Sequence, residues 1–291
     1  MSRKRFLIAS DIHLCHVDWY GVPTAERMER FVRHVKEEYA KDPFEALLFL
    51  GDYSLDHWKW DIQGCYLTEG RSRTKEFVDG YVSSLLELGV PIGFIAGNHE
   101  QYGDKLWNEL TGYDRKDFII CGDILFILLD TFGADLDPTE HSDGTFIPSD
   151  VAYIKALMEN YPSKKVILAA HHFDPEKESE EFKRLVCDDD RILCLFGGHV
   201  HKSDVIELGE EWGGKALLYT GNYSYCGVKD APPTASMWGF RDLIIDGDTL
   251  ESRYITPEND ILLDGTHVHQ PYGYQDEYKI KICGGLNGTK A

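Results

Sequence analysis

Short apolar runs alternate with amphipathic stretches over much of the chain. Five runs of four or five residues are rich in Ile, Leu, Val, Phe and Ala, which is typical of buried β-strands. They span residues 6–9, 46–50, 92–96, 166–170 and 192–196. We therefore predict that these segments are strands of the protein core.

Segments between these runs have helical periodicity. Apolar residues at about 25–41 recur on one helix face, and Thr24 is placed to cap that helix. A second helix is predicted at about 74–88, because Gly89 follows it as a stop signal, and a third at 151–161. Strands that alternate with helices favour a largely parallel sheet with helices on its faces.

The pattern changes from about residue 204. Short strand-like runs follow, and Asp246-Gly247-Asp248 fits a hairpin turn between the last two. Residues 258–291 are rich in Tyr, Gly and His and show no periodicity. We predict one domain over residues 1–257 and a C-terminal extension, residues 258–291, that packs on the domain or is partly flexible.

Composition and charge narrow the class of protein. The chain has 291 residues, with 30 Lys and Arg against 50 Asp and Glu, and a formal net charge of −20. This charge disfavours non-specific DNA binding, which needs a basic surface. No apolar run approaches the roughly 20 residues of a membrane span, and the stretch near the N-terminus is too short for a signal peptide. Seven scattered cysteines without a CxxC pair indicate reduced thiols, so we expect a cytoplasmic protein.

Residue types that bind metal ions follow each of the five apolar runs. In open α/β sheets, functional groups gather at the carboxyl ends of the strands, so we expect these residues to meet at one edge. Oxygen and imidazole ligands without thiolate suit Mn, Fe, Zn, Ni or Mg rather than a structural zinc site. The motifs are Asp11-Ile12-His13, Gly51-Asp52, Gly97-Asn98-His99-Glu100, His171-His172 and Gly197-Gly198-His199-Val200-His201.

The order of these five motifs resembles that of the calcineurin-like metallophosphoesterase family, over residues 11–201. The resemblance implies an α/β fold, a four-layer α/β/β/α sandwich of two mixed sheets, with a dinuclear metal centre. Asp52 would be shared between the two metal ions. By motif, one ion would be bound by Asp11, His13, Asp52 and His201, and the other by Asp52, Asn98, His171 and His199.

Two further residues enter through the same resemblance as catalytic candidates. His99 matches the family's catalytic histidine, which does not bind metal. Asp56 is the candidate to orient His99, although it lies four residues after Asp52, where the family's usual spacing is three. The Asp-Arg-Gly continuation of protein phosphatases is replaced here by His57-Trp58, which counts against a phosphoprotein substrate.

The implied activity is hydrolysis of phosphate esters with two divalent or trivalent metal ions. Ions about 3.5–4 Å apart would bind a bridging water and lower its pKa. The resulting hydroxide would attack phosphorus while His99 assists the leaving group.

Three functions compete at this point. The most favoured is a small-molecule phosphodiesterase or phosphomonoesterase, because the chain is acidic. A metal-dependent DNA nuclease is the alternative, although residues 258–291 are short and not basic for such a partner. A non-catalytic interaction module is the second alternative, although such proteins tend to lose the residues retained here. We expect neither a nucleic acid nor a membrane as partner, and the oligomeric state stays open.

For other polar and aromatic residues, two interpretations are compared. His172 is interpreted as a packing residue rather than a ligand. His16 and Asp18 either contact the substrate or lie in a solvated loop. Trp58 and Trp60 either form an aromatic wall for an apolar leaving group or pack in the core.

Overall fold

Two six-stranded β-sheets form the centre of this computed structural model, which describes residues 2–15, 18–55, 69–133, 144–225, 238–256 and 277–282. The first sheet has the strand order β12-β11-β10-β1-β2-β3 and the second the order β4-β5-β6-β7-β9-β8. Both sheets mix parallel and antiparallel pairs. The strands are β1 (Lys4–Ala9), β2 (Ala46–Leu50), β3 (Ile92–Ile95), β4 (Asp117–Cys121), β5 (Ile124–Leu129), β6 (Lys165–Ala170), β7 (Ile192–Gly197), β8 (Ser203–Glu207), β9 (Ala216–Thr220), β10 (Phe240–Asp246), β11 (Thr249–Ile255) and β12 (Glu277–Lys281).

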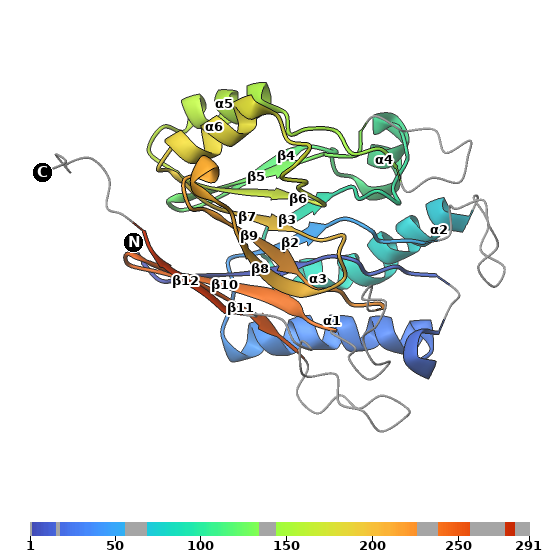
Figure 1. Cartoon of the computed structure of the whole chain (residues 1–291). Coiled ribbons are helices and arrows are strands. Elements are labelled where there is room, and N and C mark those ends of the chain that lie inside the picture. The colour runs from blue at the N-terminus through green and yellow to red at the C-terminus, as the bar shows by residue number, and fades with distance from the viewer. Residues whose placement is uncertain are drawn as a thin grey trace, which may run out of the picture.

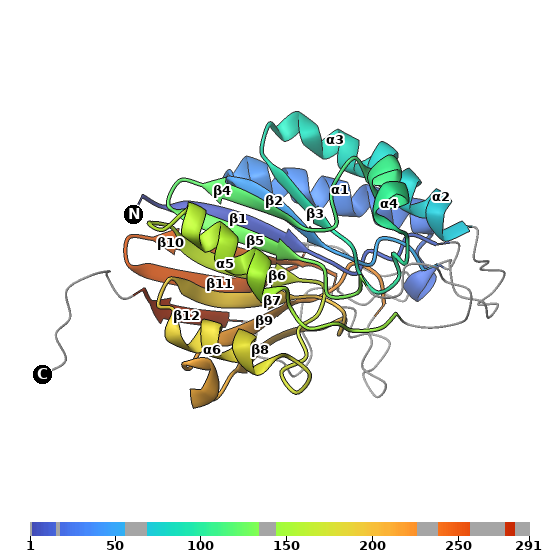
Figure 2. The ribbon, with the colours of Figure 1, turned by 90° about the horizontal axis from the view of Figure 1, so that it is seen from above.

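Helices cover the outer face of each sheet (Figures 1 and 2). On the first sheet lie α1 (Thr24–Lys41), α4 (Asp104–Thr111) and a helical stretch of α2 (Glu69–Glu76), the π-helix η2 (Phe77–Val82), α3 (Ser83–Leu85) and η3 (Leu86–Leu88). On the second lie α5 (Val151–Asn160) and α6 (Glu180–Asp188). Short 3-10 turns occur at η1 (Trp19–Gly21) and η4 (Glu210–Trp212). The predicted four-layer α/β/β/α sandwich of two mixed sheets is therefore confirmed.

In strand β1, successive side chains pack alternately against the outer helices and in the core between the two sheets. Leu7 and Ala9 pack with the outer helices, whereas Phe6 and Ile8 point into the core between the two sheets. The Phe6 ring meets Phe126 of β5 edge-on, with centroids 4.8 Å apart. Because side chains of a strand alternate between its two faces, a strand buried on both sides reads as a continuous apolar run.

The five predicted strands and the three predicted helices are present, with ends that differ by a few residues. The N-cap of α1 is Pro23 rather than Thr24, and the carboxylate of Asp18 accepts a hydrogen bond from the Thr24 N–H at 3.0 Å. The hairpin at Gly247 joins β10 and β11 as predicted. The sheets are mixed rather than largely parallel, because β4, β8, β10, β11 and β12 pair antiparallel with their neighbours.

The C-terminal part of the chain contributes an edge strand. β12 pairs antiparallel with β11, so that Thr249 faces Lys281 and Arg253 faces Glu277. The division at residue 257 stays a prediction, since 257–276 and 283–291 lie outside the described residues. None of the helices in the described ranges has the length and apolar character needed to cross a bilayer.

Candidate metal centre

Loops at the carboxyl ends of β1, β2, β3, β6 and β7 meet at one edge of the sandwich. Backbone hydrogen bonds tie them together: the N–H groups of Asp11 and His13 donate to the carbonyls of Gly51 and Asp52 at 3.1 and 3.0 Å. The structure thus brings together eight of the nine predicted site residues, while Asp56 lies outside the described residues. The eight are Asp11, His13, Asp52, Asn98, His99, His171, His199 and His201.

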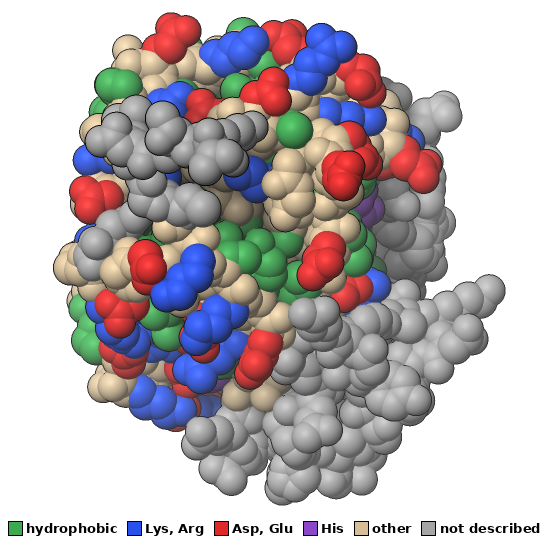
Figure 3. Space-filling model, turned by 60° about the vertical axis from the view of Figure 1, so that its left-hand side comes forward, with side chains coloured by type: hydrophobic (Ala, Val, Ile, Leu, Met, Phe, Trp, Pro, Cys, Tyr) green, Lys and Arg blue, Asp and Glu red, His purple; other side chains and the backbone are tan. Residues whose placement is uncertain are grey.

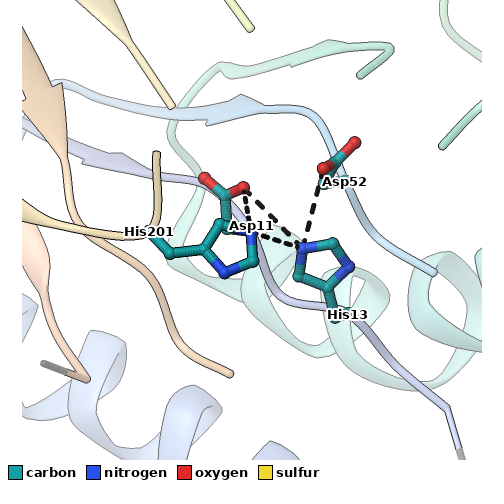
Figure 4. A group of neighbouring side chains, drawn as sticks. All are labelled: Asp11, His13, Asp52 and His201. Atoms are coloured by element: carbon teal, nitrogen blue, oxygen red, sulfur yellow. Dashed lines mark hydrogen bonds and ion pairs between the residues drawn. The ribbon is translucent and has the colours of Figure 1, made fainter. Parts of the chain in front are cut away.

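A first cluster consists of Asp11, His13, Asp52 and His201, whose side chains point toward one another and are all buried (Figure 4). The Nε2 atoms of His13 and His201 are 3.0 Å apart. His201 Nε2 lies 3.1 Å from Asp11 Oδ1, and His13 Nε2 lies 3.6 Å from Asp52 Oδ2. Ligands at right angles around a cation bound at about 2.1 Å are about 3 Å apart, so the spacing of these atoms fits one metal ion.

A second cluster consists of Asp52, Asn98, His171 and His199. Asn98 Oδ1 lies 2.8 Å from His171 Nε2 and 2.9 Å from His199 Nδ1. His171 Nε2 is also 3.2 Å from Asp52 Oδ2, the same oxygen that faces His13. The carboxylate of Asp52 therefore belongs to both clusters.

Hydrogen bonds on the far side of two histidine rings orient the atoms that face the clusters. His171 Nδ1 lies 2.6 Å from the Leu50 carbonyl, and His201 Nδ1 lies 3.0 Å from the Tyr225 carbonyl. A carbonyl only accepts hydrogen bonds, so each Nδ1 carries a proton, and the ring, when neutral, presents a lone pair at Nε2. This is the tautomer that binds metal ions through Nε2.

Electrostatics in the two clusters also favour bound cations. Burial alone would lower the pKa of His171, but the Asp52 carboxylate raises it to about 9. The pKa of His201 is raised against the effect of burial by Asp11. Burial would raise the pKa of Asp11, yet His201 and His13 hold it well below its usual value. The carboxylates thus draw positive charge into the centre, as protons or as metal cations.

The backbone of these loops is strained at particular residues. In the described part of the chain, the non-glycine residues with positive φ are Asp11 (55°), His13 (44°), Asp52 (58°), His199 (71°) and His201 (54°). A left-handed residue with a Cβ costs on the order of 1 kcal/mol or more. Such strain persists only where surrounding contacts impose it, and it gathers at functional sites.

His99 lies beside both clusters and is 3% exposed. Its N–H donates to Asp52 Oδ1 at 3.1 Å, and its Nε2 is 3.8 Å from Asp52 Oδ2. His172 instead packs against the His199 ring, with centroids 4.6 Å apart. Burial and His199 lower the pKa of His172 to about 3, so this ring is neutral.

Glu100 is a site residue to which the sequence motif gave no role. Its buried carboxylate accepts hydrogen bonds from the N–H groups of Gly97, Asp52 and Tyr53 at 2.8–2.9 Å, so it joins the loop after β2 to the loop after β3. Burial and Asp52 raise its pKa to about 7. The sequence did contain a signal for Glu100: it is a carboxylate within a motif of metal-binding residues, yet it was not assigned as a metal ligand.

Of the remaining candidates, the structure describes Asp18. Asp18 binds the first backbone N–H of α1, as described above. His16, Trp58 and Trp60 lie outside the described residues.

The chain matches a known protein family, and its structure is similar to known structures. A family model of calcineurin-like phosphoesterases matches residues 4–203. The structure is similar to a dimetal phosphatase from Danio rerio, with a TM-score of 0.64 and 12% identity, over 96% of this chain and 99% of that one. It is also similar to a purple acid phosphatase from yellow lupin (Lupinus luteus) seeds, with a TM-score of 0.58 and 14% identity, over 99% of this chain and 57% of that one. No curated protein matches the chain. At these identities the structural matches establish a shared fold.

Proposed function

Because this chain belongs to the calcineurin-like phosphoesterase family and is a metal-dependent phosphoesterase, we propose that it hydrolyses a small-molecule phosphodiester or phosphomonoester. The first cluster would hold one metal ion and the second cluster the other, with Asp52 shared. The oxygen and imidazole donors suit Mn, Fe, Zn, Ni or Mg. When bound, two such ions supply an activated water and neutralise the charge of the phosphate group.

One observation carries the ligand assignment. Every non-glycine residue with positive φ in the described ranges is one of the seven proposed ligands. Local sequence alone does not impose this conformation, although Asp and His adopt it more readily than most residues. The strain is maintained by hydrogen bonds between loops, and its result is that side chains from distant segments converge on two points.

His99 would assist the leaving group. It is held beside Asp52 by its own N–H, at the border of the two clusters, where a substrate phosphate would bind. A histidine there can donate a proton to the departing oxygen, an effect typically worth about 10²–10⁴-fold in rate. That Asp56 orients His99 stays a prediction.

Charge supports a small substrate over a nucleic acid. The net charge of −20 repels a polyanion. On the face shown in Figure 3, acidic and basic side chains are interspersed rather than gathered into a basic surface. We therefore propose a small phosphate ester as substrate and keep DNA as an outcome of the test.

We also propose a cytoplasmic location. The described cysteines Cys15, Cys121, Cys187 and Cys194 are free thiols, which fits a reducing compartment.

A substrate panel with the metal-loaded protein tests this function. We expect hydrolysis of bis-p-nitrophenyl phosphate or p-nitrophenyl phosphate after loading with manganese. His99→Gln should lower kcat by about 10²–10⁴-fold with unchanged manganese content. His34→Gln, at a buried histidine outside the site, is the matched control. Failure to hydrolyse both esters, or faster cleavage of single-stranded DNA, would contradict the proposal.

A further inference from the structure

Arg27, near the start of α1, is a buried cation behind the first cluster. Its residue is 0% exposed, and its guanidinium binds backbone carbonyls rather than a carboxylate in the described structure. Nη1 donates to Ile12 and Tyr223 at 2.5 and 2.6 Å, and Nη2 donates to His13 at 2.9 Å. Burial and the positive end of the α1 dipole both disfavour a cation here. The contacts that Arg27 makes must outweigh these two costs.

The carbonyls that Arg27 binds belong to the segment that carries Asp11 and His13 and to the loop that supports it. In the supporting loop, the Ser224 hydroxyl and the Tyr223 N–H donate to the Asp11 carbonyl at 2.8 and 3.2 Å. On the opposite side, the N–H groups of Asp11 and His13 bind the loop of Asp52. The segment, which contains two left-handed residues, is therefore held from both sides.

Arg115 has an equivalent place behind the second cluster. It is 5% exposed, and its Nη1 donates to the carbonyls of Glu100 and Tyr102 at 2.8 and 2.9 Å. These carbonyls lie in the loop that carries Asn98 and His99. Unlike Arg27, Arg115 is paired with a carboxylate, since its Nε lies 2.7 Å from Asp130 Oδ2.

We propose that each cluster has its own positioning arginine: Arg27 sets the segment of Asp11 and His13, and Arg115 sets the loop of Asn98. Each acts through backbone carbonyls and makes no hydrogen bond to the atoms that would bind metal. The inference rests on the proposed function, because it takes the two clusters as metal sites. Loss of one arginine should weaken one metal site and spare the other.

Manganese titration of the metal-free protein, followed by calorimetry, tests this proposal without any substrate. We expect the wild type to bind two Mn²⁺ ions. Arg27→Met should weaken one of the two binding steps by about 10–100-fold, which is typical for groups that orient ligands, and Arg115→Met should weaken the other. Arg27→Lys should recover part of the affinity, because an ammonium keeps the charge but lacks the fork that reaches several carbonyls.

A double-mutant cycle assigns each arginine to its cluster. In a His13→Ala background, where the first cluster is already disabled, Arg27→Met should change the remaining step less than twofold. In a His199→Ala background, the same substitution should weaken the remaining step by about 10–100-fold.

The control is Arg5→Lys, at a buried arginine at the other end of β1 that pairs with Asp242. It should lower the melting temperature without changing either binding step. The proposal is overturned if Arg27→Met and Arg27→Lys bind both ions as the wild type does, or if the loss is equal in the two histidine backgrounds. A wild-type protein that binds no manganese would instead contradict the proposed function.

Discussion

The two clusters share Asp52 but differ in how completely the protein encloses and strains them. All four residues of the first cluster are buried, and all four have positive φ. In the second cluster His199 is partly exposed, and only Asp52 and His199 have positive φ. The first cluster also has two carboxylates, whereas the second adds a neutral amide to the shared one.

If the two clusters bind metal ions as proposed, this difference predicts that the first retains its ion and that the second is more accessible. Two buried carboxylates attract a cation strongly, because charge interactions are less screened away from solvent. A partly exposed histidine and a neutral amide would bind a cation more weakly and would be more accessible to solvent and substrate. We therefore expect the first cluster to hold its ion more tightly than the second.

Asp52→Asn should weaken metal binding at both clusters at once, because Asp52 belongs to both. We expect low occupancy of both ions and a loss in kcat/KM of at least about a thousandfold, or ~4 kcal/mol. Elemental analysis and ester hydrolysis measure the two effects. Asp18→Asn, at the start of α1, is the control, and full occupancy in Asp52→Asn would show that Asp52 is not shared.

Removal of single histidines should separate the two sites. After timed dialysis against EDTA, His199→Ala should keep one manganese ion, while His13→Ala should retain manganese about tenfold more weakly, or ~1.4 kcal/mol. Elemental analysis at each time point gives the retained metal. Equal loss of manganese from the two variants would mean that burial does not determine which site binds its ion more tightly.

Gly198→Ala should disturb the first cluster more than the second. A Cβ at Gly198 would lie 2.5 Å from Ser10 Oγ and 2.7 Å from Asp11 Oδ2, so Asp11 must move. We expect the tighter manganese step to weaken by severalfold in a calorimetric titration, and the weaker step to change less. Gly80→Ala has open space around its Cβ and is the control. A change in the weaker step alone would reverse our ranking of the clusters.

Protonation of His34 should give a smaller, metal-independent effect. Burial lowers the pKa of this ring to about 3, so the unfolded chain takes up a proton below its usual pKa of 6.5 while the folded protein does not. Stability therefore falls as the pH drops below 6.5, by about 1 kcal/mol at pH 5.8 relative to pH 7.5. Urea unfolding of His34→Gln and wild type, both without metal, measures the difference. If the free energy of unfolding depended on pH in the same way in both proteins, His34 would not be the cause of the effect.

The core strands and the motif residues could be predicted because each is a local signal. β2 and β9 coincide with apolar runs, since a strand buried on both faces needs continuous hydrophobic residues. β5 was missed although its run of Ile, Leu and Phe is equally apolar. Asp130, which follows β5, pairs with Arg115.

The supporting residues could not be predicted, because their surroundings come from distant segments. Arg27 lies near the polar start of an amphipathic helix, so its side chain would be expected to be exposed to solvent. Its burial arises only when the segments of His13 and Tyr223, far apart in sequence, close over the start of α1. The left-handed φ of Asp11 likewise depends on partners in other loops.

The edge strand β12 has a consequence for how the chain can be shortened. Its removal would leave the backbone N–H and C=O groups along β11 open on one side. An uncovered edge is a template for pairing with another chain. Truncation before Glu277 should therefore promote self-association while leaving the residues of the two distant clusters in place.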